Sequence, residues 1–190
     1  MDAVAALRAG LPVLLPTDTV YGLISAPDES SAANLYALKG RSREQPTAIL
    51  AATVDALLAA VPELPETTLR KLLPGAFTLV LPNPAGRFDW LTGGMPAPIG
   101  VRVPNLPEPT SEIVGQLGVV LATSANDPGG PNPTTLDDVP RRIRDGCGAE
   151  VDLGALPGTP STVLDLSGDE PRVLREGAVP STEALRRLGS

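Results

Sequence analysis

Four polar segments interrupt an otherwise apolar chain, and each carries residue types that can bind a small polar substrate. The first, 16–23 (PTDTVYGL), places two threonine hydroxyls and the Asp18 carboxylate directly after an apolar run. Such groups could bind an amine, a hydroxyl or a metal ion. The same residues could also close a turn by hydrogen-bonding to their own backbone. Composition alone favours the turn, so this segment by itself assigns no function.

The second segment, 39–46 (KGRSREQP), follows a predicted helix and contains the cations Lys39, Arg41 and Arg43. Together they would neutralise a polyphosphate, because arginine forms bidentate contacts and lysine supplies a point charge. Cations near the C-terminus of a helix also interact favourably with the helix dipole. The helix dipole explains one or two of these cations better than it explains all three.

The third segment, 122–132 (ATSANDPGGPN), places the Ser124 hydroxyl and the Asn126 amide close together, after an apolar strand and before a Gly-Pro loop. These groups could hold phosphate or ribose oxygens, and the backbone amides of Gly129 and Gly130 could assist. An ordinary cluster of turn residues is the alternative.

The fourth segment is 161–163 (STV) together with Arg175, and Arg102 is an isolated cation between Val101 and Val103. A charge in an apolar strand either faces solvent, which is the commoner case, or pairs with a buried anion. Polar groups at strand ends are where α/β sheets bind their ligands. The four segments therefore form the candidate site.

The absence of histidine among 190 residues narrows the possible chemistry. It excludes histidine-based triads, His-ligated zinc and haem, and histidine proton shuttles. The single cysteine, Cys147, excludes an internal disulfide framework and is typical of a reducing cytoplasm, where we expect the protein to be located. A net charge of −7 argues against a generic basic nucleic-acid coat protein. The chain also lacks the Walker A and Gly-x-Gly-x-x-Gly patterns, so any nucleotide must be bound by a site other than a P-loop or a Rossmann fold.

Short apolar runs alternate with amphipathic stretches, and these elements must position the polar segments. We expect helices at 2–9, 28–40, 53–61, 65–73, 110–117, 135–144 and 181–188. We expect strands at 11–15, 48–51, 77–81, 99–103, 118–122, 161–166 and 171–175. This alternation indicates an α/β fold with a twisted, largely buried sheet flanked by helices, in a single domain over 1–190. The last two strands, joined across Gly168, are expected to pair as an antiparallel hairpin, which makes the sheet mixed. No apolar run approaches the roughly 18 residues that cross a bilayer, so no membrane association is expected.

In this order the segments resemble those of the YrdC-like threonylcarbamoyl-AMP synthases, in their single-domain form. The resemblance rests on 16–23, Lys39-Gly40-Arg41, Val101-Arg102-Val103-Pro104, Ser124-Ala125-Asn126, and Ser161-Thr162-Val163 with Val173-Leu174-Arg175. It extends from about residue 10 to residue 178. One short motif alone would be weak evidence for this family. The occurrence of all these motifs in the family's order is strong evidence for the resemblance.

The resemblance implies a twisted open mixed sheet, flanked by helices, around a positively charged concave site. Such proteins condense L-threonine, bicarbonate and ATP into threonylcarbamoyl-AMP and release pyrophosphate, so they act as nucleotidyltransferases. The product serves the threonylcarbamoyladenosine modification of tRNA, and tRNA or tRNA-modification proteins are the partners to expect. Mg²⁺ would be bound mostly by the ATP triphosphate, since no all-protein carboxylate cage is evident.

Carried over position by position, the resemblance assigns two groups of ligands. The residues expected to bind threonine are Thr19, Arg102, Ala122 and Ser161. Those expected to bind ATP and its phosphates are Lys39, Arg41, Gln45, Ser124, Asn126, Asn132 and Arg175. The residues expected to be catalytic are Lys39, Arg41, Ser124 and Asn126. The chain departs from the family pattern at Ser42, where proline is usual, at Gln45, and at Leu50, a position near the threonine site that is often histidine.

The residue types suit this chemistry without histidine. A carbamate that attacks the α-phosphorus expels pyrophosphate, which needs no general acid, so alignment and charge neutralisation are the main requirements. An RNA-binding or translation-associated module could use the same basic concave surface, although one Trp, two Tyr and two Phe are few for that role. Carbamoyl transfer through carbamoyl-AMP, as in hydrogenase maturation, would require additional domains.

Overall fold

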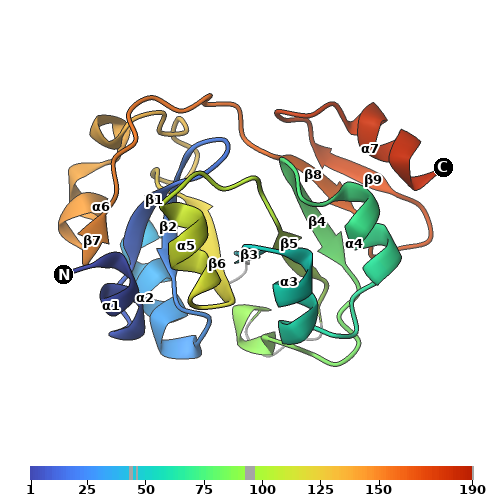
Figure 1. Cartoon of the computed structure of the whole chain (residues 1–190), viewed down its shortest axis with the longest axis horizontal. Helices are drawn as coiled ribbons and strands as arrows, with labels where there is room; N and C mark the ends of the chain where they lie inside the picture. The colour runs from blue at the N-terminus through green and yellow to red at the C-terminus, as the bar shows by residue number, and fades with distance from the viewer. Residues whose placement is uncertain (43–44, 46, 93–96, 190) are drawn as a thin grey trace.

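Nine strands form one twisted sheet across the described residues, which are 1–42, 45, 47–92 and 97–189 of this computed structural model (Figure 1). The strands are β1 (Val13–Pro16), β2 (Tyr21–Ser25), β3 (Ala48–Ala51), β4 (Phe77–Leu81), β5 (Ile99–Arg102), β6 (Val119–Ser124), β7 (Ala149–Glu150), β8 (Thr162–Asp165) and β9 (Arg172–Arg175). Their order is β7-β1-β2-β6-β3-β5-β4-β8-β9. The pairs β1–β7, β3–β5 and β4–β8 are parallel and the other neighbours are antiparallel, so the expected mixed α/β sheet is confirmed.

Helices cover both faces of this sheet. The α-helices are α1 (Ala3–Arg8), α2 (Glu29–Lys39), α3 (Val54–Ala60), α4 (Glu66–Leu72), α5 (Thr110–Gly115), α6 (Arg141–Asp145) and α7 (Ser181–Leu188), with 3-10 turns η1 (Asp89–Thr92) and η2 (Leu136–Asp138). In Figure 1, α1, α2 and α6 lie in the left half and α3, α4 and α7 in the right half, and the chain between β7 and β8 crosses from one half to the other along the top. None of the described helices is long and apolar enough to span a membrane.

Two apolar cores form because alternate residues of each strand point to opposite faces of the sheet. In β1, Leu14 belongs to the larger core, which also contains residues of α2, α3, α4, α6 and α7. Its neighbours Val13 and Leu15 pack into the smaller core, against α1 and α5. All three side chains are fully buried. The sheet is therefore a rigid two-sided platform, and its strand ends are well placed to hold polar groups.

The ends of α2 explain where the first cations of the site lie. The Asp28 side chain accepts a hydrogen bond from the Ser31 backbone amide at 3.0 Å and caps the start of the helix. The helix ends at Gly40, which adopts the left-handed conformation (φ 67°) that favours glycine. Lys39 therefore lies in the last turn, and Arg41 follows just beyond the helix end.

Several predicted boundaries differ from the structure. β2 was not predicted, because its apolar residues follow a polar turn without a break in the sequence, and the two-residue β7 was also missed. The single helix expected at 135–144 is instead η2 followed by α6, because Pro140 (ψ 132°) has an extended backbone between them. The predicted strand at 118–122 continues to Ser124, which brings polar residues of the third segment onto the sheet itself. The hairpin of β8 and β9 is confirmed.

Candidate active site

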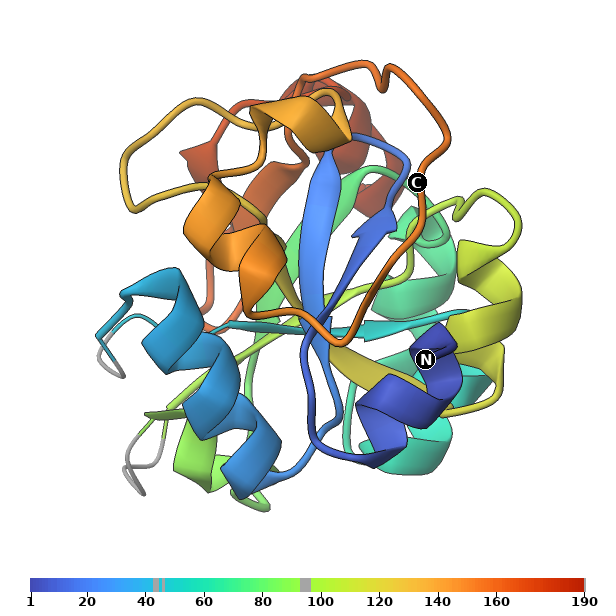
Figure 2. The ribbon, with the colours of Figure 1, turned by 90° about the vertical axis from the view of Figure 1, so that its left-hand side faces the viewer.

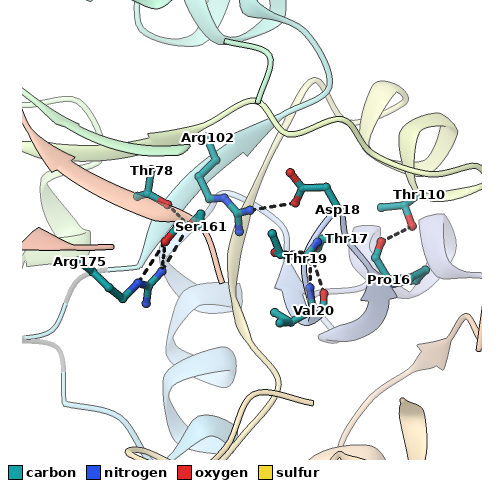
Figure 3. Close-up of polar contacts among 10 residues, drawn as sticks. All are labelled: Pro16, Thr17, Asp18, Thr19, Val20, Thr78, Arg102, Thr110, Ser161 and Arg175. Atoms are coloured by element: carbon teal, nitrogen blue, oxygen red, sulfur yellow. Dashed lines mark hydrogen bonds and ion pairs between the residues drawn. The ribbon is translucent and has the colours of Figure 1, made fainter. Parts of the chain in front are cut away.

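The turn between β1 and β2 uses its first threonine for its own structure. The Thr17 hydroxyl donates to the Val20 carbonyl at 2.7 Å and accepts from the Thr19 and Val20 amides at 3.3 and 3.2 Å (Figure 3). The turn explanation is therefore correct for Thr17. The turn holds Asp18 and Thr19 in fixed positions at the end of the hairpin.

Arg102 on β5 faces the Asp18 carboxylate rather than solvent. Its Nη2 lies 3.2 Å from Asp18 Oδ1, and the two side chains are only 12% and 10% exposed (Figure 3). Asp18 Oδ2 and Arg102 Nε have no hydrogen-bond partner among the described residues. Burial raises the pKa of Asp18, and the Arg102 charge opposes that shift. Arg102 is thus one member of a largely buried ion pair. This is the less common of the two arrangements predicted for a cation in an apolar strand.

Ser161 links β4, β8 and β9. Its hydroxyl lies 2.8 Å from the Thr78 hydroxyl, and its carbonyl accepts two hydrogen bonds from Arg175, at 3.1 Å from Nε and 2.8 Å from Nη2 (Figure 3). The guanidinium of Arg175 is therefore held mainly by the Ser161 backbone. Burial lowers the pKa of Arg175.

Lys39 binds the third polar segment with all three of its ammonium protons. Nζ donates to the Ser124 carbonyl at 2.5 Å, to the Asn126 side-chain oxygen at 2.6 Å, and to the Asn126 carbonyl. Burial and the nearby Arg41 charge lower the pKa of Lys39 to about 8. Asn126 also accepts from the Ser124 hydroxyl at 2.6 Å and donates to the Gly130 carbonyl at 2.6 Å. The loop after β6 is therefore organised around Asn126 and fixed by Lys39.

Two adjoining cavities lie over these elements. The Arg102 cavity, of about 210 Å³, is lined by Thr19, Val20, Arg41, Thr47, Ala48, Thr78, Arg102, Ala122, Thr123, Ser124, Asn132, Pro160, Ser161, Val163 and Arg175. The Lys39 cavity, of about 490 Å³, is lined by Lys39, Arg41, Gln45, Thr123, Ser124, Asn126, Asp127, Pro128, Gly129, Gly130, Asn132 and Arg175. Arg41 lies at their junction, where one of its nitrogens, Nη1, donates to the Thr123 hydroxyl at 3.1 Å.

The predicted site residues divide between these cavities. Those expected to bind threonine, Thr19, Arg102, Ala122 and Ser161, all line the Arg102 cavity. Lys39, Gln45 and Asn126 line the Lys39 cavity, whereas Arg41, Ser124, Asn132 and Arg175 line both. The structure thus brings every predicted residue to one continuous site. Arg43, in the second polar segment, lies outside the described residues.

Some residues of the site were missed by the sequence reasoning. Thr47 and Thr78 line the Arg102 cavity, but each stands alone in an apolar stretch and gives no motif. Asp18 was visible in the first segment, but its pairing with Arg102 could not be inferred from spacing. Leu50 does not line either cavity: it is fully buried in the smaller core, farther along β3.

The site contains cations, hydroxyls and amides. Within the described ranges, no group of three or more carboxylate, cysteine or histidine side chains is arranged to hold a metal ion. Asp127 is the carboxylate that lines the Lys39 cavity. Such a site can bind and align anionic substrates and neutralise developing charge.

The mixed sheet and the two adjoining cavities, which share the cations Arg41 and Arg175, define an α/β domain with a cationic site at its strand ends. More specifically, the chain belongs to the Sua5/YciO/YrdC family: the family model described as "Telomere recombination" matches residues 5–177. It is 33% identical over 194 residues to a putative threonylcarbamoyl-AMP synthase from Mycobacterium tuberculosis, and the match covers 100% of this chain and 88% of the relative.

Two further comparisons agree with this assignment. The threonylcarbamoyl-AMP synthase of Bacillus subtilis is 32% identical over 195 residues, covering 99% of this chain and 56% of the relative. The crystal structure of Pyrococcus abyssi Sua5 complexed with L-threonine superimposes with a TM-score of 0.85 at 31% identity, covering 98% of this chain. This chain spans 56% of the Pyrococcus chain.

Proposed function

We propose that this chain synthesises L-threonylcarbamoyladenylate from L-threonine, bicarbonate and ATP and releases pyrophosphate. The observation that carries the proposal is the junction of two cavities that share Arg41 and Arg175. The Arg102 cavity has a size suited to an amino acid and offers hydroxyls and a guanidinium. The Lys39 cavity is larger and offers the cations Lys39, Arg41 and Arg175, which suit a triphosphate. The names of the relatives and the L-threonine complex of the Pyrococcus protein support the same assignment.

In this proposal the Arg102 cavity holds threonine. The Arg102 guanidinium, fixed by Asp18, pairs with the substrate carboxylate, because a buried arginine recognises a carboxylate strongly. The hydroxyls of Thr19 and Ser161 hydrogen-bond to the polar groups of the amino acid, and Ala122 forms part of the cavity wall.

The Lys39 cavity holds ATP, with Arg41, Ser124, Asn132 and Arg175 beside the phosphates. Lys39 would contact a phosphate only by exchanging one of its three oxygen acceptors in the loop. Its contribution is therefore mainly to hold that loop in place. Mg²⁺ would enter with the substrate, on the triphosphate.

The chemistry follows from this placement. A proton from the threonine ammonium converts bicarbonate to CO₂ and water, and the freed amine attacks the CO₂ carbon. Loss of a second proton to solvent leaves a carbamate, whose oxygen attacks the α-phosphorus of ATP as the bond to pyrophosphate breaks. Arg41 and Arg175, which line both cavities, are placed to neutralise the charge that develops between the two substrates.

Mass spectrometry of the protein incubated with ATP, threonine and bicarbonate tests this proposal. We expect threonylcarbamoyl-AMP and pyrophosphate, formed only when all three substrates are present. Full ATP turnover without threonine would contradict the proposal and indicate a plain ATPase. Salt-dependent RNA binding without threonine-dependent ATP consumption would instead favour an RNA-binding module. We further propose that the product is used in the cytoplasm for tRNA modification.

A further inference from the structure

The end of α2 and the loop after β6 form two walls of the Lys39 cavity, and one side chain outside the cavity contacts both. Arg142 of α6 donates hydrogen bonds to the carbonyls of Leu38 and Lys39 at the end of α2, the latter at 3.5 Å. Its Nη2 also binds the carboxylate of Asp127 in the loop. Figure 2 shows α6, in orange, beside α2, in blue.

The backbone of Arg142 is anchored through the residue that follows it. The next residue, Ile143, is fully buried in the larger core and anchors α6. A Cβ added at Gly40 would lie at an ordinary contact distance, 3.8 Å, from Arg142 Nη2, so the guanidinium lies beside the end of α2. The guanidinium therefore bridges two segments at a set spacing, close to the end of the helix that carries Lys39.

Charge gives the bridge a second effect. Asp127 lines the Lys39 cavity alongside Lys39, Arg41 and Arg175. A carboxylate at that wall repels a polyphosphate, and its pairing with Arg142 offsets this repulsion.

The neighbouring residue, Arg141, carries the same charge as Arg142 but has different contacts. Arg141 pairs with Asp145 on its own helix at 3.2 Å, and its side chain is 89% exposed. This contact with Asp145 reaches neither wall of the cavity, and an exposed pair of this kind contributes little to stability. Arg141 is therefore a matched control for Arg142.

We propose that Arg142 is a positioning residue for nucleotide binding. It sets the spacing between the end of α2 and the loop that contains Asp127, and it neutralises the Asp127 carboxylate so that the Lys39 cavity accepts a nucleoside triphosphate. This inference rests on the proposed function, because it takes ATP as the occupant of that cavity.

Calorimetric titrations with a non-hydrolysable MgATP analogue and, separately, with threonine test the inference. We expect Arg142→Ala to weaken analogue binding about fivefold while threonine affinity stays within about twofold. Arg142→Ala combined with Asp127→Asn should bind the analogue more tightly than Arg142→Ala alone, because the uncompensated carboxylate is gone. Arg141→Ala should bind both ligands like the wild type.

Analogue affinity unchanged by Arg142→Ala, an equal loss of affinity for both ligands, or no rescue by Asp127→Asn would overturn the inference. If Arg142→Ala does not fold, Arg142→Lys replaces it: lysine keeps the charge but cannot bridge both walls, so an intermediate loss is expected and a wild-type affinity contradicts the inference. Wild-type protein that binds neither ligand would overturn the proposed function itself, whereas wild-type binding with an indifferent Arg142 variant overturns this inference alone.

Discussion

The two cavities differ in how their walls are built. Residues of β3, β4, β5, β6, β8 and β9 form about half of the Arg102 cavity lining, and Arg102 is part of an ion pair whose side chains are 12% and 10% exposed. The Lys39 cavity is walled by a helix end and a loop, and the bridge between Arg142 and Asp127 has side chains that are 49% and 54% exposed. A rigid wall of strands suits the selection of a small substrate, whereas a wall that contains a loop can adapt to a larger substrate. Substitutions should therefore have larger structural effects in the Arg102 cavity than at the rim of the Lys39 cavity.

The largest effect is expected from breaking the buried pair. Asp18→Asn leaves the Arg102 charge unpaired, so we expect the free energy of unfolding to fall by about 3 kcal/mol. Urea denaturation measures this change. Asp145→Asn, which breaks the exposed pair with Arg141, is the control and should cost less than about 1 kcal/mol. Equal losses of unfolding free energy in the two variants would contradict the expected difference between buried and exposed ion pairs in this molecule.

Arg41, which lines both cavities, comes next. We expect Arg41→Ala to lose on the order of 2–4 kcal/mol of transition-state stabilisation, measured as the ratio of kcat/KM values. Arg41→Lys should recover part of this loss, because a point charge does not reproduce the guanidinium fork. An unchanged kcat/KM in a folded alanine variant, with folding checked by circular dichroism, would make Arg41 an ordinary surface cation.

A smaller effect concerns the choice of amino acid. Val20, Val163, Ala48 and Ala122 line the Arg102 cavity and can contact the threonine methyl group. Loss of one methyl contact costs only about 1–3 kcal/mol, so serine should be a poor but detectable substrate. Competition kinetics with the two amino acids measures the ratio. Equal use of serine would show that these apolar groups do not contact the substrate.

The smallest effect is a pH dependence of the Lys39 cavity. The pKa of Lys39 is lowered to about 8, so half of the ammonium groups have lost the proton near that pH and most have lost it at higher pH. Between pH about 8 and the ordinary pKa of lysine, the unfolded chain binds more protons at this residue than the folded chain does. The contribution of Lys39 to the free energy of unfolding therefore rises with pH over that range. Nucleotide binding should nevertheless weaken a few-fold above pH about 8, because the neutral amine holds the loop less well. Calorimetry with the ATP analogue checks this, with Lys39→Arg as the variant expected to show a flatter profile.

Regular elements with unbroken apolar patterns could be predicted from the sequence. Strands 48–51 and 77–81 and the terminal helix 181–188 match the structure at both ends. Where a polar turn and a strand share one segment, as at 16–25, the strand was hidden because the site residues interrupt its pattern. The residues expected to bind threonine all line the Arg102 cavity, whereas Arg41, Ser124, Asn132 and Arg175, expected to bind ATP, line both cavities. The roles of these residues stay predictions.

Interactions between distant segments could not be predicted. Composition indicated that Lys39 was a cation for phosphate, but the fold places three oxygen acceptors around its ammonium group. Arg142 gave no signal, because its partners at the end of α2 lie more than a hundred positions away, at separations of 104 and 103. Spacing along the chain identifies which residue types are available, and only the packing of the sheet and helices decides which of them meet.

Paired calorimetry of two variants tests the division of the site most directly. Ser161→Ala removes a hydroxyl that lines the Arg102 cavity and its 3.3 Å contact with Arg175, but it keeps the carbonyl that accepts the two shorter hydrogen bonds from Arg175. Gln45→Ala changes a residue of the Lys39 cavity alone. We predict that Ser161→Ala weakens threonine binding more than binding of the ATP analogue, and that Gln45→Ala does the reverse. If Ser161→Ala loses analogue affinity while threonine affinity stays intact, the assignment of one substrate to each cavity is contradicted.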